Sequence, residues 1–171
     1  NSPPMSALLK SSTSRARLAS EMPAAVANRN ADGVNLDFEP VPNSLQSAYT
    51  QLVRDVRAAI GPSRQLTVAT TGGAASWDEG YDLTGLVAAG AADALMVVGY
   101  DFSWSGSARA GGVSPIDSPY VLDVRQAMTD YLARVPGYAE RFSLPPGLTG
   151  LAQANGEYDS TPENKLRYDL A

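Results

Sequence analysis

The segment 32–39 constrains this chain more than any other, because its side chains alternate strictly in polarity. The apolar positions are Val34, Leu36 and Phe38, and the polar positions between them are Asn35, Asp37 and Glu39. Alternation with a period of two predicts a β-strand that packs one face against the core. Acidic residues are unfavourable in strands and costly to bury. The polar face therefore indicates either a functional site or the solvent-exposed face of an antiparallel strand.

The spacing of the two carboxylates in this segment is compatible with acid–base chemistry. Asp37 and Glu39 stand two residues apart, which corresponds to about 6.6 Å along a strand. Burial and a like charge at this range both raise the pKa of a carboxyl group. One member of the pair is therefore a candidate general acid.

The composition is that of an ordinary folded domain. The chain has 171 residues, of which 44% are hydrophobic and 18% are charged, enough for one domain with a sizeable core. A formal net charge of −5 argues against a nucleic-acid partner. The sequence contains no apolar run of about 18 residues that would span a membrane, and we recognise no signal peptide in it.

Two absent residue types narrow the possible chemistry. The sequence contains no cysteine and no histidine, which excludes disulfides, thiol catalysis, a Ser-His-Asp triad and the usual zinc ligands. Acid–base catalysis would have to come from carboxylates, Tyr, Lys or Arg. A metal site built of carboxylates alone stays open, but the sequence gives no specific sign of one, so we expect no metal ion and no cofactor.

Periodicity and turn residues predict alternating strands and helices. We expect strands at 34–39, 65–70 and 94–100, and helices at 15–30, 45–60, 82–89 and from 118 onward. Pro23 should kink or divide the first helix, and Ser118 should cap the last one. The third strand is continuously apolar, so we expect it to be covered on both faces.

This order of elements predicts an α/β fold with parallel strands. Right-handed crossovers place the carboxyl ends of all the strands on one rim. Glu39 ends the first strand and Tyr100-Asp101 ends the third. Two separate strands thus bring titratable groups to the same rim, where polar residues of a barrel are functional.

Two motifs resemble glycoside hydrolase family eighteen, the chitinase-like hydrolases. The signature D-x-x-D-x-D-x-E on the fourth strand of their TIM barrel is matched by Asp32, Asn35, Asp37 and Glu39, with Asn in the second position. The segment 96–102 is similar to their sixth-strand motif, which ends in Tyr-Asp. The resemblance covers about residues 5–135 and implies a partial, TIM-barrel-like (β/α) domain.

The resemblance also implies a substrate and a role for each residue. The substrate would contain β-1,4-linked N-acetylglucosamine, as in chitin or peptidoglycan-type glycans, and its own acetamido oxygen would act as the nucleophile. Glu39 would be the acid, while Asp37 and Tyr100 would contact the acetamido group. Asn35 would act on Asp37 from behind, and Asp101 would hold the sugar. Trp77 and Trp104 lie in loops, where they either stack on sugar rings or pack against the loops.

Residues 136–171 resemble a different family. The run 146–156, Pro-Gly-Leu-Thr-Gly-Leu-Ala-Gln-Ala-Asn-Gly, is similar to the C-terminal part of bacterial polyprenyl-phosphate phosphoglycosyl transferases. Their Asp-Glu dyad and membrane-embedded helix are missing from this sequence. We therefore expect a chimeric chain, with a hydrolase-like domain at 1–135 followed by an irregular, transferase-like tail at 136–171.

Several functions remain open from the sequence. The chain is either a hydrolase segment, inactive if its barrel is incomplete, or a non-catalytic carbohydrate-binding or structural fragment. A third hypothesis is a tail that contacts a membrane or polyprenyl phosphate. An incomplete barrel would expose strand edges through which copies of the chain could associate. The resemblance implies an extracellular or cell-envelope location.

Overall fold

The computed structural model describes residues 3–77, 79–103, 106–119, 122–137 and 139. The chain forms two compact units, Asn1–Pro136 and Gly137–Ala171. All the helices and strands described here belong to the first unit, and the fold below is the fold of that unit. None of the helices in the described ranges is both long and apolar enough to cross a membrane.

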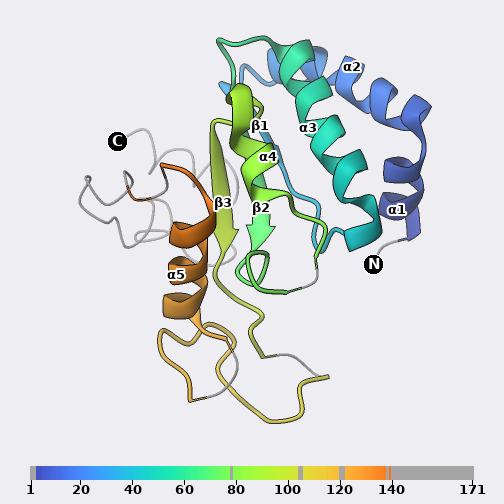
Figure 1. Ribbon diagram of the computed structural model, residues 1–171. Helices are drawn as coiled ribbons and strands as arrows, with labels where there is room; N and C mark the ends of the chain where they lie inside the picture. Colours follow the sequence, from blue (N-terminus) through green and yellow to red (C-terminus); the bar gives the residue numbers. More distant parts are fainter. Residues whose placement is uncertain (1–2, 78, 104–105, 120–121, 138, 140–171) are drawn as a thin grey trace. The chain divides into compact units, whose positions relative to one another are not determined.

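A three-stranded parallel sheet forms the centre of the first unit (Figure 1). Its strands are β1 Gly33–Leu36, β2 Gln65–Thr71 and β3 Ala94–Val98, in the order β1-β2-β3. Leu36 pairs with Val68, and Thr71 pairs with Val98. The predicted α/β architecture with parallel strands is therefore confirmed.

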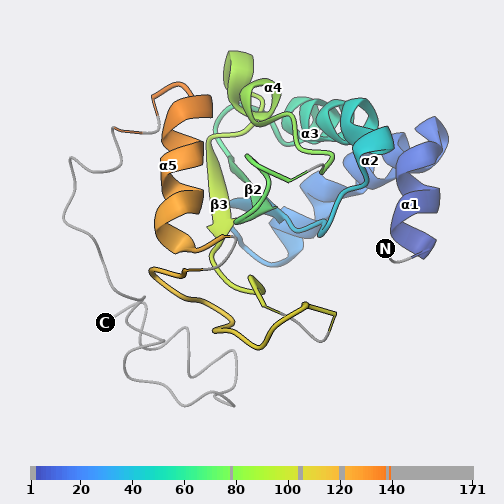
Figure 2. The same cartoon turned by 60° about the horizontal axis from the view of Figure 1, so that its bottom comes forward.

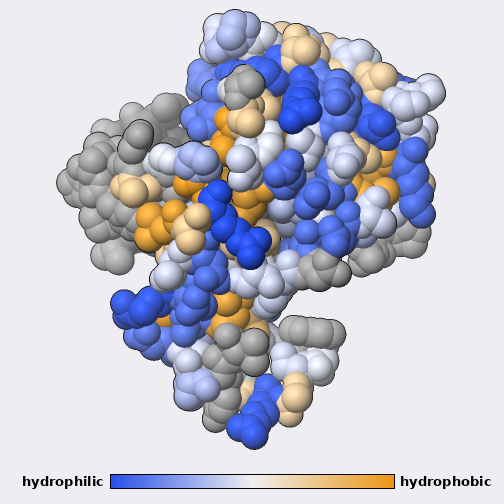
Figure 3. All heavy atoms as spheres, viewed as in Figure 1, coloured by the Kyte–Doolittle hydropathy of each residue, from blue (hydrophilic) through white to orange (hydrophobic). Residues whose placement is uncertain are grey.

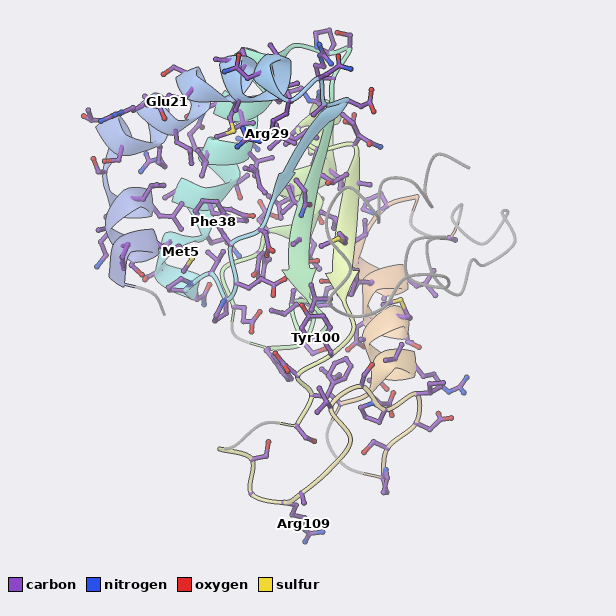
Figure 4. The ribbon with its side chains drawn as sticks, turned by 180° about the vertical axis from the view of Figure 1, so that it is seen from behind. Met5, Glu21, Arg29, Phe38, Tyr100 and Arg109 are labelled. Atoms are coloured by element: carbon purple, nitrogen blue, oxygen red, sulfur yellow. The ribbon has the colours of Figure 1, made fainter. Side chains whose placement is uncertain are left out.

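Helices connect and cover these strands. They are α1 Pro3–Lys10, α2 Ser12–Asn28, α3 Gln46–Ile60, α4 Leu83–Val87 and α5 Val124–Arg134, with 3-10 turns at Asn43–Leu45 and Ala88–Gly90. Helices α3 and α4 lie in front of the sheet in Figure 1, and the strands lie in front of them when the unit is seen from behind in Figure 4. These two helices therefore cover one face of the sheet.

The core lies between this face of the sheet and α3. Helix α3 turns an apolar stripe inward, with fully buried side chains at Tyr49, Leu52, Val53 and Val56. Leu66 and Val68 of β2 are likewise fully buried. The outward face of α3 is mostly hydrophilic in Figure 3, as the predicted helical period requires.

The amino end of β1 depends on a glycine. A Cβ atom built at Gly33 would lie 1.9 Å from the carbonyl oxygen of Gln65 on β2, far inside van der Waals contact. Gly33 pairs with Gln65 in the register of the sheet. The absence of a side chain at this position therefore permits the pairing of β1 with β2.

Three local predictions are wrong. Pro23 does not divide the helix, because α2 continues through it, while a kink at Pro23 stays a prediction. The break between α1 and α2 falls at Ser11, whose side chain accepts a hydrogen bond from the Ser14 amide at 3.2 Å. Helix α5 does not begin at Ser118. Its cap is Asp123, whose carboxylate accepts from the Gln126 amide at 2.8 Å. Aspartate is as good a cap as serine. The Asp123 carboxylate also accepts a hydrogen bond from the Ser118 amide at 2.8 Å.

The third correction concerns β3, which is not covered on both faces by described residues. Ala94 and Met96 are exposed, and the exposed fraction of Met96 is 47%. Both residues point to the face of the sheet that α3 and α4 leave uncovered, since side chains alternate along a strand. Association of copies through the edges of this sheet stays a prediction.

Candidate active site

The strands end at a common edge, which Figure 2 brings forward. Glu39 follows the end of β1. When the register between Leu36 and Val68 is continued along the chain, Glu39 falls level with Thr71, the last residue of β2. Thr71 in turn pairs with Val98 at the end of β3. The carboxylate at the end of β1 therefore lies on the predicted rim.

Two buried tyrosines hold the backbone that carries Asp37 and Glu39. The Tyr81 hydroxyl donates to the Phe38 carbonyl at 2.7 Å, and the Tyr49 hydroxyl lies 3.5 Å from the Leu36 carbonyl. The rings of Phe38 and Tyr49 are 5.5 Å apart, and those of Tyr49 and Tyr81 are 6.0 Å apart, edge to face. Burial raises the pKa of both phenols, so they remain protonated donors.

The environment of Glu39 favours its protonated form. One oxygen, Oε1, is buried and has no hydrogen-bond partner among the described residues. Burial is the main cause that raises the pKa of Glu39, and three nearby carboxylates raise it further, in the order Asp37, Glu79 and Asp101. A carboxyl group that keeps its proton is suited to donating it as a general acid.

Glu79 is a further carboxylate at this rim, in the loop after β2. Its Oε2 accepts a hydrogen bond from the Thr71 hydroxyl at 2.5 Å. Burial raises the pKa of Glu79, and the Thr71 hydrogen bond opposes that shift. The backbone of the same loop pairs with the segment after Glu39, because the Gly80 amide donates to the Val41 carbonyl at 2.7 Å.

Asn35 belongs to the same polar face, within β1. It is exposed, and its amide oxygen accepts from the Thr67 hydroxyl on β2 at 2.8 Å. Alternation along the strand places Asn35 and the exposed Asp37 on the same side. This is the face of the sheet opposite α3 and α4.

Tyr100 and Asp101 follow β3. Tyr100 lies just beyond the tips of the strands in Figure 4, with 54% of its side chain exposed. Asp101 adopts a left-handed backbone conformation with φ of 61°, which Asp tolerates better than most residues. Its charge is among those that raise the pKa of Glu39, so the two carboxylates lie within electrostatic reach.

The tryptophans and a neighbouring hollow lie in the loops. The Trp77 ring packs over Gly73, where an added Cβ atom would stand 2.1 Å from it, and 40% of Trp77 is exposed. Trp104 lies outside the described residues. A hollow of about 630 Å³ opens in the loop after β3, and its lining includes Phe102, Arg109 and Leu122. Arg109 lies at the far end of that loop in Figure 4.

No metal site is found in the described part of the chain. Among these residues, no group of three or more Asp, Glu, His or Cys side chains is arranged to hold a metal ion.

A protein-family model matches most of the chain. Residues 1–147 match the family model described as glycosyl hydrolases family 18. The chain belongs to glycosyl hydrolase family 18. The match extends past 135, the residue at which we expected the hydrolase-like part to end. No curated protein gives a significant match.

Solved structures of similar fold include several members of this family. The YdhD protein of Bacillus subtilis, assigned as a sporulation-specific glycosylase, is 27% identical with a TM-score of 0.63, over 75% of this chain and 41% of that one. The chitinase domain of the spore coat protein CotE from Clostridium difficile is 21% identical with a TM-score of 0.62, over 77% and 42%. A Cycas revoluta chitinase in complex with allosamidin is 21% identical with a TM-score of 0.65, over 77% and 43%.

The chain therefore spans about two fifths of the length of these solved structures. The likeness confirms the prediction of a partial, TIM-barrel-like fold. The similarity of residues 136–171 to polyprenyl-phosphate transferases stays a prediction, because residues 140–171 lie outside the described part of the chain.

Sequence reasoning missed four residues that the structure places at this candidate site: Thr67, Thr71, Glu79 and Tyr81. Glu79 was detectable, since it is an acidic residue in a loop that follows a strand, like Asp101. Thr71 was detectable as the polar end of β2. Nothing in the sequence pairs Tyr81 with Phe38 or Thr67 with Asn35, because these contacts arise only when distant segments meet.

Proposed function

We propose that this chain is a catalytic segment of a glycoside hydrolase that acts on β-1,4-linked N-acetylglucosamine polymers, chitin or peptidoglycan-type glycans. The observation that carries the proposal is Glu39, a carboxyl group at the rim of a family 18 fold whose pKa is raised by burial and by the neighbouring carboxylates. Asp37 lies two residues before it, on a segment that Tyr81 holds in place.

The geometry supports a substrate-assisted mechanism. Glu39 gives its proton to the glycosidic oxygen as the bond to the anomeric carbon breaks. The acetamido oxygen of the same sugar attacks that carbon and forms an oxazolinium-like intermediate, which the Asp37 carboxylate orients and stabilises. Water then opens the intermediate and returns a proton to Glu39. No protein nucleophile is needed, because the nucleophile belongs to the substrate.

The residues beyond β3 supply contacts for the sugar in this proposal. Tyr100 donates its hydroxyl to the acetamido group, which its exposed position permits. Asp101 hydrogen-bonds the sugar. Asn35 hydrogen-bonds the sugar or acts on the neighbouring Asp37 from behind. Trp77 and Trp104 are proposed to stack on sugar rings. The hollow that begins at Phe102, directly after Asp101, offers room for further rings.

Relatives support the choice of ligand and location. A variant of the Cycas revoluta chitinase has been solved in complex with (GlcNAc)4, and YKL-39 has been solved with the same tetrasaccharide. We accordingly propose an oligosaccharide containing N-acetylglucosamine as the partner. The spore coat origin of CotE supports an extracellular or cell-envelope location.

The test is turnover of a fluorogenic N-acetyl-chitooligosaccharide by the wild-type chain and by Glu39→Gln. Glutamine keeps the shape of the side chain but has no proton to give, so the rate should fall by about 10²- to 10⁴-fold. Glu21→Gln is the matched control, because Glu21 is exposed on α2 in an ion pair with Arg17. Equal turnover by Glu39→Gln and the wild-type chain would contradict the proposal.

A second candidate is a non-catalytic carbohydrate-binding module, which the exposed Tyr100 and the hollow of about 630 Å³ in the loop after β3 support. This candidate predicts saturable binding of chitotetraose in calorimetry without turnover. Absence of binding would exclude it.

A further inference from the structure

We propose that Glu79 is a positioning residue for the Glu39 acid: it holds a negative charge beside Glu39, so that Glu39 keeps the proton that bond cleavage consumes. The inference rests on the proposed function for its catalytic meaning. The interaction between the two carboxyl groups can be measured independently of that function.

Two connections tie Glu79 to the segment that carries Glu39. The Thr71 hydroxyl donates to Glu79 Oε2, and Thr71 is level with Glu39 in the continued register of β1 and β2. The backbone of Glu79 bridges to Pro42, just beyond the Glu39-Pro40 step. Glu79 is therefore fixed from both sides, by β2 and by the chain that leaves the acid.

The space between the two loops is tightly filled, which keeps this arrangement in place. A Cβ atom built at Gly80 would stand 2.3 Å from the Pro42 carbonyl oxygen, so the loop after β2 approaches the segment after Glu39 as closely as backbone allows. The adjacent Tyr81 donates to the Phe38 carbonyl. The residues that follow Glu79 are therefore held against the segment that carries Glu39.

The two carboxyl groups differ in which one ionises first. Glu79 receives a hydrogen bond from Thr71, which favours its charged form. Glu39 Oε1 is buried and receives none from the described residues. Where two nearby carboxyl groups have unequal surroundings, the first to ionise makes the second harder to ionise. Burial raises the pKa of both groups, but among the described residues only Glu79 has a hydrogen bond that opposes the rise, so we assign the charge to Glu79 and the proton to Glu39.

The described groups that act on Glu39 by their charge are all acidic. Asp37 lies on its own segment, Glu79 lies after β2 and Asp101 lies after β3. The phenols of Tyr49 and Tyr81, packed beneath, stay neutral because burial raises their pKa. Neutralising Glu79 therefore removes a repulsion that no described cation offsets, and the pKa of Glu39 should fall.

The experiment is a carboxyl-carbon NMR titration of Glu39 in the full 171-residue chain, for the wild type and Glu79→Gln. We expect the pKa of Glu39 to fall by about 0.5 to 1 unit in Glu79→Gln. Glu79→Asp keeps the charge and should retain most of the wild-type value. Glu21→Gln neutralises an exposed carboxylate on α2 and should cause no shift.

Turnover measured against pH gives the second readout. If the chain hydrolyses the chitooligosaccharide, the basic limb of the Glu79→Gln profile should move to lower pH with the NMR value. A purely structural role of Glu79 would lower the rate at every pH without this shift. Absence of turnover in the wild type rejects the proposed function, while the NMR titration still decides the inference.

An unchanged pKa of Glu39 in Glu79→Gln overturns the inference, whatever the turnover. If Glu79→Gln does not fold, Thr71→Val provides the test. It removes the hydrogen-bond donor that favours the charged form of Glu79, while the Glu79 carboxyl group itself is retained. The pKa of Glu39 should then fall by a smaller amount. A Glu39 titration identical to that of the wild type in folded Thr71→Val would equally overturn it.

Discussion

Three tyrosines lie near the ends of the three strands, and they differ in burial and in hydrogen bonding. Tyr81 is buried and donates to the Phe38 carbonyl beyond β1. Tyr131 of α5 is fully buried, and its hydroxyl lies 2.7 Å from the Thr71 carbonyl and 2.8 Å from the Thr70 hydroxyl at the end of β2. Tyr100, which follows β3, is more than half exposed.

This difference divides the rim into a part that buried tyrosines hold by hydrogen bonds and a part that is exposed to solvent. The backbone next to Asp37 and Glu39 is held by buried donors, which suits groups whose geometry decides a reaction. Tyr100 is exposed, and the proposed function assigns its hydroxyl to a ligand. Replacing each tyrosine with phenylalanine, which removes only the hydroxyl, tests this division.

Tyr131→Phe should have the largest effect on stability. The buried Thr70 hydroxyl and Thr71 carbonyl would both lose a partner, and the cost should be about 1–3 kcal/mol of unfolding free energy. Urea denaturation followed by circular dichroism measures it, with an unchanged slope showing that the unfolded state is unaffected. A cost no larger than that of Tyr100→Phe would contradict the assignment of Tyr131 as an anchor.

Tyr81→Phe should destabilise less but affect turnover more. One hydrogen bond to the Phe38 carbonyl is lost, at a cost of about 0.5–1.5 kcal/mol. Because that carbonyl lies between Asp37 and Glu39, the rate with a chitooligosaccharide should also fall at temperatures where the variant is fully folded. Tyr131→Phe, compared under the same conditions, controls for a general loss of rigidity. Wild-type turnover in folded Tyr81→Phe would refute the positioning role.

Tyr100→Phe should have the smallest effect on stability, within about 0.5 kcal/mol, as expected for an exposed side chain. Under the proposed function it should weaken chitotetraose binding or slow turnover, because a donor to the acetamido group is lost. Calorimetry and the fluorogenic assay measure these two effects. A loss of stability comparable to that of Tyr131→Phe would show that Tyr100 is a third anchor.

The sequence was sufficient for the parts of the fold that depend on local periodicity. Strict alternation placed β1, and the apolar stripe from Leu45 to Ile60 placed α3. Parallel strands and their common rim followed from the order of the elements. Glu39 and Asp37 could be selected as candidates because acidic residues are depleted in strands, and Asp101 because it follows a strand that ends at the same rim.

The failures have physical causes. The apolar run of β3 predicted cover on both faces, but exposure depends on what packs against the sheet. Ser118 and Asp123 are both good caps, and only the packing of α5 decides between them. Tyr81 and Tyr131 look like ordinary core residues in the sequence, and their hydroxyl partners lie 43 and 60 positions away.

Gly33 has a consequence for how this site tolerates change. It touches no proposed substrate and carries no charge, yet any side chain there would meet the Gln65 carbonyl and displace the strand that delivers Asp37 and Glu39. In a mutational library selected for activity, Gly33 should be as intolerant as the acid itself. A map of tolerated substitutions would thus show low tolerance on both sides of β1. At Gly33 a side chain would clash, and at Glu39 the proposed acid would be lost.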